Sequence, residues 1–153
     1  MLLVAMAVCP ERLTAQEPAP GYAEIQRAFL QEEFERVASL AGEFLERHPD
    51  APERVRVWLW RALSLDRLQQ SHEALQELDR LKRRLTPDDP LWAEALFWEG
   101  EISRRSFQMI RARLAYQRLL ERSPDSMWAS QAQMGLGLIA LHQQALPAAI
   151  QQF

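Results

Sequence analysis

The side chains that most often do chemistry do not assemble a recognisable catalytic site in this sequence. Each of the three histidines falls near the end of a predicted helix: His48, His72 and His142. There is no HExxH pair, nucleophile elbow, phosphate-binding loop or dinucleotide-binding glycine pattern. The acid pairs at residues 32–33 and 88–89 fall at predicted helix starts, where carboxylates stabilise the helix dipole. We therefore expect no enzyme activity, no metal and no cofactor.

One pattern in the chain is regular, because the dipeptide Pro-Asp occurs three times at periods of 38 and 37 residues. A tiny residue stands 13 positions after each proline, an alanine 25 positions after it and a large apolar residue 29 positions after it. In chain order these landmarks are Ala62, Ala74 and Leu78, then Gly100, Ala112 and Tyr116, then Gly137, Ala149 and Phe153. Repeats of this length indicate a solenoid of stacked units.

Each unit fits two helices joined by a tight turn. A tiny residue in the first helix lets the second helix approach closely, and the alanine and the large residue lie one turn apart on that second helix. Pro-Asp ends one unit and begins the next, because proline cannot continue a helix and aspartate caps one. The predicted helices cover residues 22–30, 33–48, 51–68, 71–85, 91–105 and 107–122. The last pair begins near Ser126, turns at Gln143-Gln144 and restarts at Pro147.

This register resembles the tetratricopeptide repeat (TPR), whose units carry a small residue, an alanine, an aromatic residue and a proline in this order. The clearest unit has Gly100, Ala112, Tyr116 and Pro124. The resemblance implies an all-α, right-handed α-solenoid over residues 21–153, with about 3.5 repeats and an incomplete C-terminal end. The long connection around each Pro-Asp looks like that of bacterial envelope TPR proteins, of the outer-membrane assembly lipoprotein and Tol-Pal-associated periplasmic coordinator type.

The resemblance also implies that the first helix of each unit lines a concave groove for a peptide or protein. The residues assigned to this groove are Trp60, Arg67, Trp98, Glu101, Arg104, Arg105 and Gln131. Trp60 and Trp98 recur 38 residues apart, and tryptophan and arginine dominate binding hot spots. The alternative is that both pack between helices, as we expect for Trp58, Trp92 and Trp128. A suitable ligand has apolar anchors and some acidic character.

The start of the chain predicts a secretory signal peptide over residues 1–15, followed by a linker at 16–20. Residues 1–8 form an apolar run, and Leu13-Thr14-Ala15 fits a cleavage site. The run lacks a positively charged beginning, so a partly buried terminus is the alternative. Cys9 is the only cysteine in the sequence, so the chain cannot form an internal disulfide. The resemblance to envelope lipoproteins suggests lipidation of Cys9 as an alternative, but Val8 stands where those proteins have a small residue.

Composition and charge narrow the range of partners. The 153 residues carry a net charge of −3, which provides no electrostatic basis for binding nucleic acid or an anionic membrane. We expect a protein or peptide partner and no small-molecule substrate. We expect a periplasmic or envelope-associated location, where the partner could belong to an outer-membrane-associated complex. Two alternatives stay open: a cytoplasmic TPR adaptor, and the non-catalytic TPR part of a larger enzyme.

Overall fold

The computed structural model describes the backbone of residues 18–150 and the side chains of residues 18–143. The predicted signal peptide, Cys9 and Phe153 therefore lie outside the described residues, and the side chain of Ala149 is not described. The described backbone contains seven helices and no strand. They are α1 (Tyr22–Leu30), α2 (Phe34–Arg47), α3 (Arg54–Arg67), α4 (Ser71–Lys82), α5 (Pro90–Arg105), α6 (Met109–Arg122) and α7 (Ala129–Ile150).

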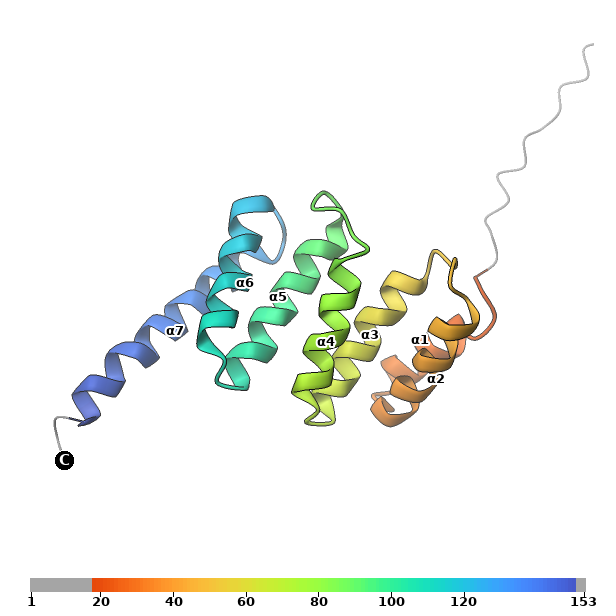
Figure 1. Ribbon diagram of the computed structural model, residues 1–153, viewed down its shortest axis with the longest axis horizontal. Coiled ribbons are helices and arrows are strands. Elements are labelled where there is room, and N and C mark those ends of the chain that lie inside the picture. The colour runs from red at the N-terminus through yellow and green to blue at the C-terminus, as the bar shows by residue number, and fades with distance from the viewer. Residues whose placement is uncertain (1–17, 151–153) are drawn as a thin grey trace, which may run out of the picture.

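The helices stack side by side in chain order along the long axis of the molecule (Figure 1). Each of the first three pairs, α1 with α2, α3 with α4 and α5 with α6, packs as a hairpin, and every pair contacts the next. A hairpin buries only part of its apolar surface, so the remainder is covered by the neighbouring hairpin. This arrangement confirms the predicted all-α solenoid of helix–turn–helix repeats.

The turn inside each hairpin has the same backbone geometry in all three repeats. A residue with positive φ follows the first helix: Glu32 (57°), Gln69 (64°) and Phe107 (60°). The next N–H then reaches back to a carbonyl five residues earlier, at 3.0, 2.9 and 2.8 Å in the three repeats. These bonds satisfy carbonyls that the end of the helix would otherwise leave unpaired.

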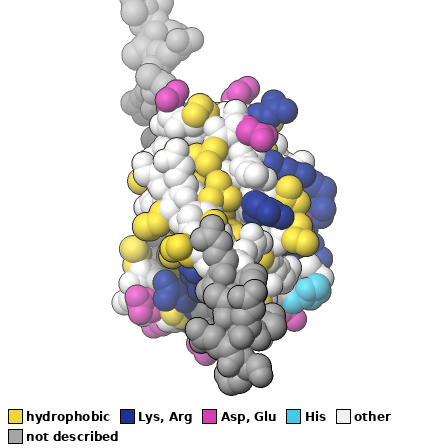
Figure 2. Space-filling model, turned by 90° about the vertical axis from the view of Figure 1, so that its left-hand side faces the viewer, with side chains coloured by type: hydrophobic (Ala, Val, Ile, Leu, Met, Phe, Trp, Pro, Cys, Tyr) yellow, Lys and Arg dark blue, Asp and Glu magenta, His cyan; other side chains and the backbone are white. Residues whose placement is uncertain are grey.

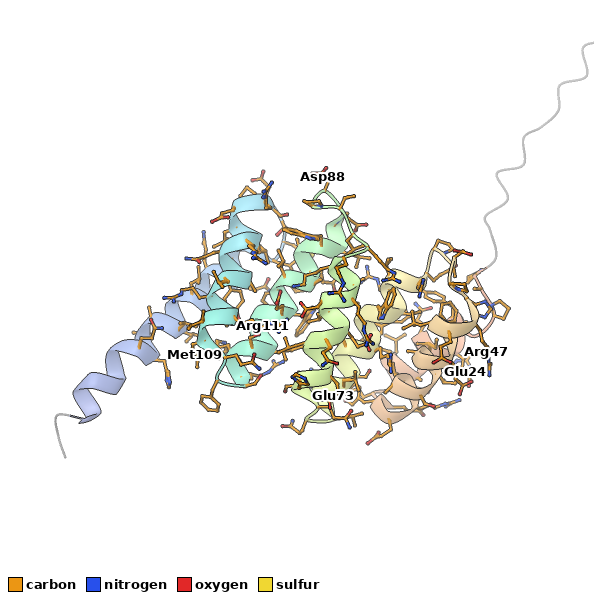
Figure 3. The ribbon with its side chains drawn as sticks, viewed as in Figure 1. Glu24, Arg47, Glu73, Asp88, Met109 and Arg111 are labelled. Atoms are coloured by element: carbon orange, nitrogen blue, oxygen red, sulfur yellow. The ribbon has the colours of Figure 1, made fainter. Side chains whose placement is uncertain are left out.

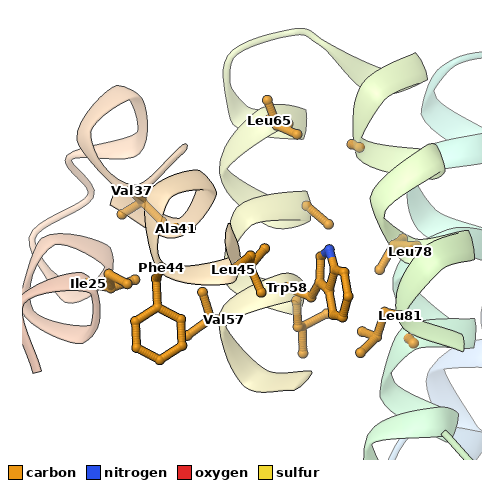
Figure 4. Packing of buried hydrophobic residues seen from close by; sticks show 14 of the residues in the cluster. Ile25, Val37, Ala41, Phe44, Leu45, Val57, Trp58, Leu65, Leu78 and Leu81 are labelled. Atoms are coloured by element: carbon orange, nitrogen blue, oxygen red, sulfur yellow. The ribbon is translucent and has the colours of Figure 1, made fainter. Parts of the chain in front are cut away.

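The landmark residues of the sequence lie in the core between the hairpins. Ala62, Ala74, Leu78, Ala112 and Tyr116 are all fully buried. Figure 4 shows the N-terminal part of this core, where side chains from α1, α2, α3 and α4 meet in one continuous layer. A second cluster continues the core through α5, α6 and α7. The core is therefore shared between neighbouring repeats and runs along the whole solenoid.

Tyr116 is closely enclosed, because its ring lies between two glycines. A Cβ atom on Gly100 of α5 would lie 2.3 Å from Cε1 of the ring. A Cβ atom on Gly135 of α7 would lie 2.6 Å from Cε2, on the other edge of the ring. Real Cβ atoms do not approach so closely, so both positions require glycine if the tyrosine stays in place.

The C-terminal helix differs from the expectation at its predicted turn. α7 continues from Ala129 to Ile150 through Gln143-Gln144, where a turn was predicted, because glutamine, alanine and leucine are strong helix formers. Gly137 was expected to pack against a returning helix, as Gly100 does. A Cβ atom on Gly137 would meet nothing within 4 Å among the described residues, and the side chains predicted to face it, Ala149 and Phe153, are not described. The glycine of α7 that touches the preceding repeat is Gly135.

A network of four charged side chains joins α4, α5 and α6. Arg111 donates to both carboxylate oxygens of Asp79 at 2.9 Å and to Glu99 at 2.9 Å. Lys82, the only lysine in the sequence, bonds Glu99 and lies 3.1 Å from Asp79. Figure 3 shows Arg111 on α6 among the side chains that lie between α6 and α4. Each carboxylate of this cluster is therefore matched by two cations.

The pKa values of two carboxyl groups predict how stability depends on pH. Burial raises the pKa of Asp79, but hydrogen bonds from Arg111 and the charge of Lys82 outweigh burial and lower it. Burial likewise raises the pKa of Glu101, and bonds from Arg104 and Tyr116 outweigh it. The folded protein thus binds fewer protons than the unfolded chain, so its stability is complete above the unfolded pKa values of about 4 and falls at lower pH.

We expect the urea midpoint of unfolding to be level between about pH 7 and pH 5 and to fall between about pH 4 and pH 3. The contribution of Asp79 to this fall disappears in Asp79→Asn, which should have a lower midpoint at pH 7 and a shallower decline. Circular dichroism at fixed pH values measures both. A midpoint that stays level to pH 3 in the unsubstituted protein would contradict the ion-pair geometry.

Candidate protein-binding surface

The inner face of the solenoid is formed by the first helix of each repeat. Backbone contacts join α1 to α3, α3 to α5 and α5 to α7, whereas the backbones of α2, α4 and α6 are too far apart to contact one another. A row of helices is closest together on its concave side, so these contacts place α1, α3, α5 and α7 there.

In the described part of the chain, no helix is both long and apolar enough to span a membrane.

Trp60 on α3 is the centre of an aromatic cluster on the inner helices. Its ring stacks on Tyr22 with centroids 5.4 Å apart and on Phe29 with centroids 5.6 Å apart, both residues of α1. Trp60 keeps part of its surface exposed. Tyr22 and Phe29 were not among the predicted site residues, although Tyr22 precedes Trp60 by the same 38 residues that separate Trp60 from Trp98.

Trp98 on α5 belongs to a second aromatic cluster. Its ring lies 5.2 Å from that of Phe97 and 6.2 Å from that of Trp128, which precedes α7. Phe97 and Trp128 also stack on each other at 4.7 Å. Trp98 is half-buried, as Trp60 is, so each of the two tryptophans packs against neighbouring rings and still presents some surface. Stacking against a neighbour holds each ring in one orientation.

The charged residues of the inner face are largely paired with one another. Arg56 of α3 bonds Glu94 of α5 at 3.0 Å. Arg105 of α5 reaches back to Asp66 of α3 at 2.6 Å. These two ion pairs join residues that are 38 and 39 positions apart, so they link successive repeats. The pair with Asp66 also neutralises Arg105, which was expected to be a cationic edge of the groove.

Glu101 and Arg104 form a further neutral unit on the same helix. Arg104 donates to Glu101 at 2.9 Å, and the Tyr116 hydroxyl donates to the other carboxylate oxygen at 2.5 Å. The bond to Glu101 raises the pKa of Arg104, and burial together with the same carboxylate raises the pKa of Tyr116. Glu101 is therefore held by bonds within its own chain, and one of these bonds fixes the hydroxyl group of Tyr116.

The remaining two predicted groove residues lie on the inner helices α3 and α7. Arg67, at the end of α3, is exposed, and its guanidinium lies 5.9 Å from the centroid of the Phe34 ring at the start of α2. Gln131 lies exposed on α7. The structure thus brings Trp98, Glu101, Arg104 and Arg105 together on α5, and it supports an apolar inner face better than the cationic one that the sequence suggested.

A hollow of about 600 Å³ lies where α5 and α7 begin. Trp128 and the exposed Met127 contribute apolar walls, and the Arg56–Glu94 ion pair lies at another side. The connecting segments at residues 87–90 and 122–128 complete it. Local sequence patterns do not predict this hollow, because it is assembled from two connections that are far apart in the chain.

The fold and this surface define a helical-repeat protein of the solenoid class. The profile of the Tetratricopeptide repeat family matches residues 22–90 and 111–153, which is most of the chain, so the protein belongs to the tetratricopeptide repeat family. Proteins of this family are typically non-catalytic scaffolds that bind proteins or peptides. No curated protein matches the sequence.

Proposed function

We propose that this protein is a scaffold that binds a peptide or protein partner along the concave face formed by α1, α3, α5 and α7. The observation that carries the proposal is the pair of partly exposed tryptophans, Trp60 and Trp98, on adjacent inner helices. Aromatic anchors that are already ordered lose little entropy on binding. Glu94, Glu101 and Asp66 neutralise the neighbouring arginines, so these arginines offer little attraction to an acidic ligand. The favoured ligand is therefore an extended or helical peptide with apolar anchors rather than a strongly acidic one.

Photo-crosslinking in cells of the source organism tests this proposal. A benzophenone amino acid at Gln131 on the inner face should give a discrete adduct with a second protein. The same probe at Ser39, an exposed residue of the outer helix α2, is the control. Trp98→Leu should weaken the Gln131 adduct, because it removes an aromatic anchor. Equal adducts at both positions, or none at Gln131, would refute binding on the concave face.

We further propose that the scaffold acts in the bacterial envelope, where it organises periplasmic or outer-membrane protein complexes. Support comes from the apolar run at residues 1–8 with a cleavage motif at 13–15, and from the resemblance of the repeat spacing to envelope TPR proteins. The intact mass of the protein from separated cell fractions tests this. A chain starting at Gln16 in the periplasm supports export. An uncleaved chain in the cytoplasm favours the alternative of a cytoplasmic adaptor.

A further inference from the structure

The outer surface of the third repeat carries an apolar stripe that the other repeats lack. Phe107 at the turn and Ile110 and Leu114 on α6 leave 77%, 68% and 48% of their surfaces exposed. Their spacing of three and four residues places them on one face of the helix. The equivalent residues of the first two repeats are polar and exposed: Glu32, Glu35 and Ser39, and Gln69, His72 and Gln76. The stripe is therefore not a requirement of the repeat fold.

Phe107 is unfavourable for folding in two respects. It exposes an aromatic ring to water, and it adopts φ of 60°, a left-handed conformation that bulky side chains rarely take. Glycine is the residue that helices prefer at this kind of terminus. Gln69 adopts the same conformation with a polar side chain, so a polar residue satisfies the turn equally well. Phenylalanine here has no structural purpose within the described residues.

The stripe borders a hollow of about 510 Å³, which Met109 and Arg111 help to line. Phe107 also borders a second hollow of about 300 Å³, which is lined by Arg104 and Arg105 at the end of α5 and by Leu138, Ile139 and His142 of α7. The apolar surface thus continues from α6 to the C-terminal helix. Figure 2 views this end of the molecule, where hydrophobic side chains lie beside a group of basic ones. Two adjoining hollows fit successive apolar side chains of one helix.

The charges near the stripe indicate what kind of helix it would accept. Arg118 lies one turn beyond Leu114 on the same face, and Arg113 and Arg122 lie on the same helix. None of these three arginines has an acidic partner within 4 Å in the described part of the chain, whereas Arg111 is held by Asp79 and Glu99. Glu121 is the only acidic residue of α6. The stripe therefore has a mainly cationic border.

We propose that the stripe formed by Phe107, Ile110 and Leu114 is a second docking site, separate from the concave face, for an amphipathic helix whose apolar residues are flanked by acidic ones. Acidic flanks would complement Arg113, Arg118 and Arg122. A second copy of this chain is a poorer occupant, because a symmetric contact through α6 would bring the same arginines face to face. The site lies on the outer helix of its repeat, so it does not depend on the concave face binding a partner.

Crosslinking with identification of the captured peptide tests this proposal. The probe is a benzophenone amino acid at Leu114, and the control is the same probe at Gln76, the equivalent residue of the preceding repeat. We expect the Leu114 adduct alone to yield a peptide from another protein, with apolar residues at helical spacing and acidic flanks. A peptide from this chain, a lipid adduct, a peptide without acidic flanks, equal capture at Gln76 or no adduct would each overturn the proposal.

A pair of glycine variants separates docking from folding. Phe107→Gly and Gln69→Gly both place glycine at a left-handed position, so neither should lower the melting temperature. Phe107→Gly should weaken the Leu114 adduct by about tenfold or more, as expected for a binding hot spot, and Gln69→Gly should leave it unchanged. The adduct at Gln131 on the concave face should survive in both variants. Its loss in Phe107→Gly would make the stripe part of the concave site and would overturn the proposal.

Discussion

Gly100→Ala should lower the free energy of unfolding by about 3 kcal/mol, at the upper end of the range for overpacked cores. The new methyl group would lie 2.3 Å from the buried ring of Tyr116. The ring cannot move away, because Gly135 closes its other edge and Glu101 holds its hydroxyl group. The clash is therefore relieved only by moving the backbones of α5 and α6 apart, and not by a change of side-chain rotamer. This displacement is the cause of the lost stability.

The two glycines of α7 provide an internal comparison for this prediction. Gly135→Ala should also be destabilising, by about 2 kcal/mol, because its methyl group meets the same ring. Gly137→Ala has open space around it and lies in a helix, so it should be neutral or stabilising by up to about 1 kcal/mol. The two variants differ only in which face of α7 carries the methyl group.

Urea unfolding followed by circular dichroism measures all three variants against the unsubstituted protein. Hydrogen exchange shows in addition whether Gly135→Ala opens α7 alone, because solenoid repeats can unfold from an end. The expected order of stability is Gly137→Ala highest, then Gly135→Ala, then Gly100→Ala. If Gly137→Ala were as destabilising as Gly135→Ala, α7 would pack through the face that the sequence register suggested.

Arg111→Met should lower the free energy of unfolding by about 2 kcal/mol. The variant keeps most of the aliphatic stem but removes three hydrogen bonds, two to Asp79 and one to Glu99. Glu99 is almost fully buried and would keep only Lys82, which Asp79 shares. Breaking a fully buried pair costs about 3–5 kcal/mol, and the value is smaller here because Arg111 remains one-third exposed to solvent.

Arg118→Met is the matched control on the same helix. Arg118 is exposed and has no ion pair in the described part of the chain, so its loss should change stability by less than about 0.5 kcal/mol. Chemical denaturation of both variants at pH 7 gives the comparison. If the two variants have the same midpoint, the four-residue network contributes nothing to the cohesion of α4, α5 and α6.

Much of the fold could be predicted from local patterns in the chain. The recurrence of Ala62 and Gly100 at one offset, and of Leu78 and Tyr116 at another, predicted paired helices, and the six helices from α1 to α6 follow the predicted ranges closely. The reason is physical: helix periodicity and close helix approach depend on residue size at short, regular spacing. Residue size and spacing can be read from the sequence without knowing the tertiary structure.

The candidate site was less predictable, because its properties depend on which residues of different repeats come together. Arg105 looked like a free cation in the sequence, but it is paired with Asp66 of the preceding repeat. Trp60 was identified from its spacing, but the ring of Phe29 that orients it was not. Ion pairs and ring stacking depend on distances between helices, which a single helix does not encode.

The sequence by itself therefore determined the repeat, its helices and the residue sizes in its core. Tertiary structure alone decided which glycine of α7 touches Tyr116, which arginines are neutralised and where an apolar stripe stays exposed among the described residues. The difference lies in the range of the interactions. Helices form from contacts three and four residues apart, whereas packing between repeats joins residues about 38 positions apart through the exact rotation of each helix.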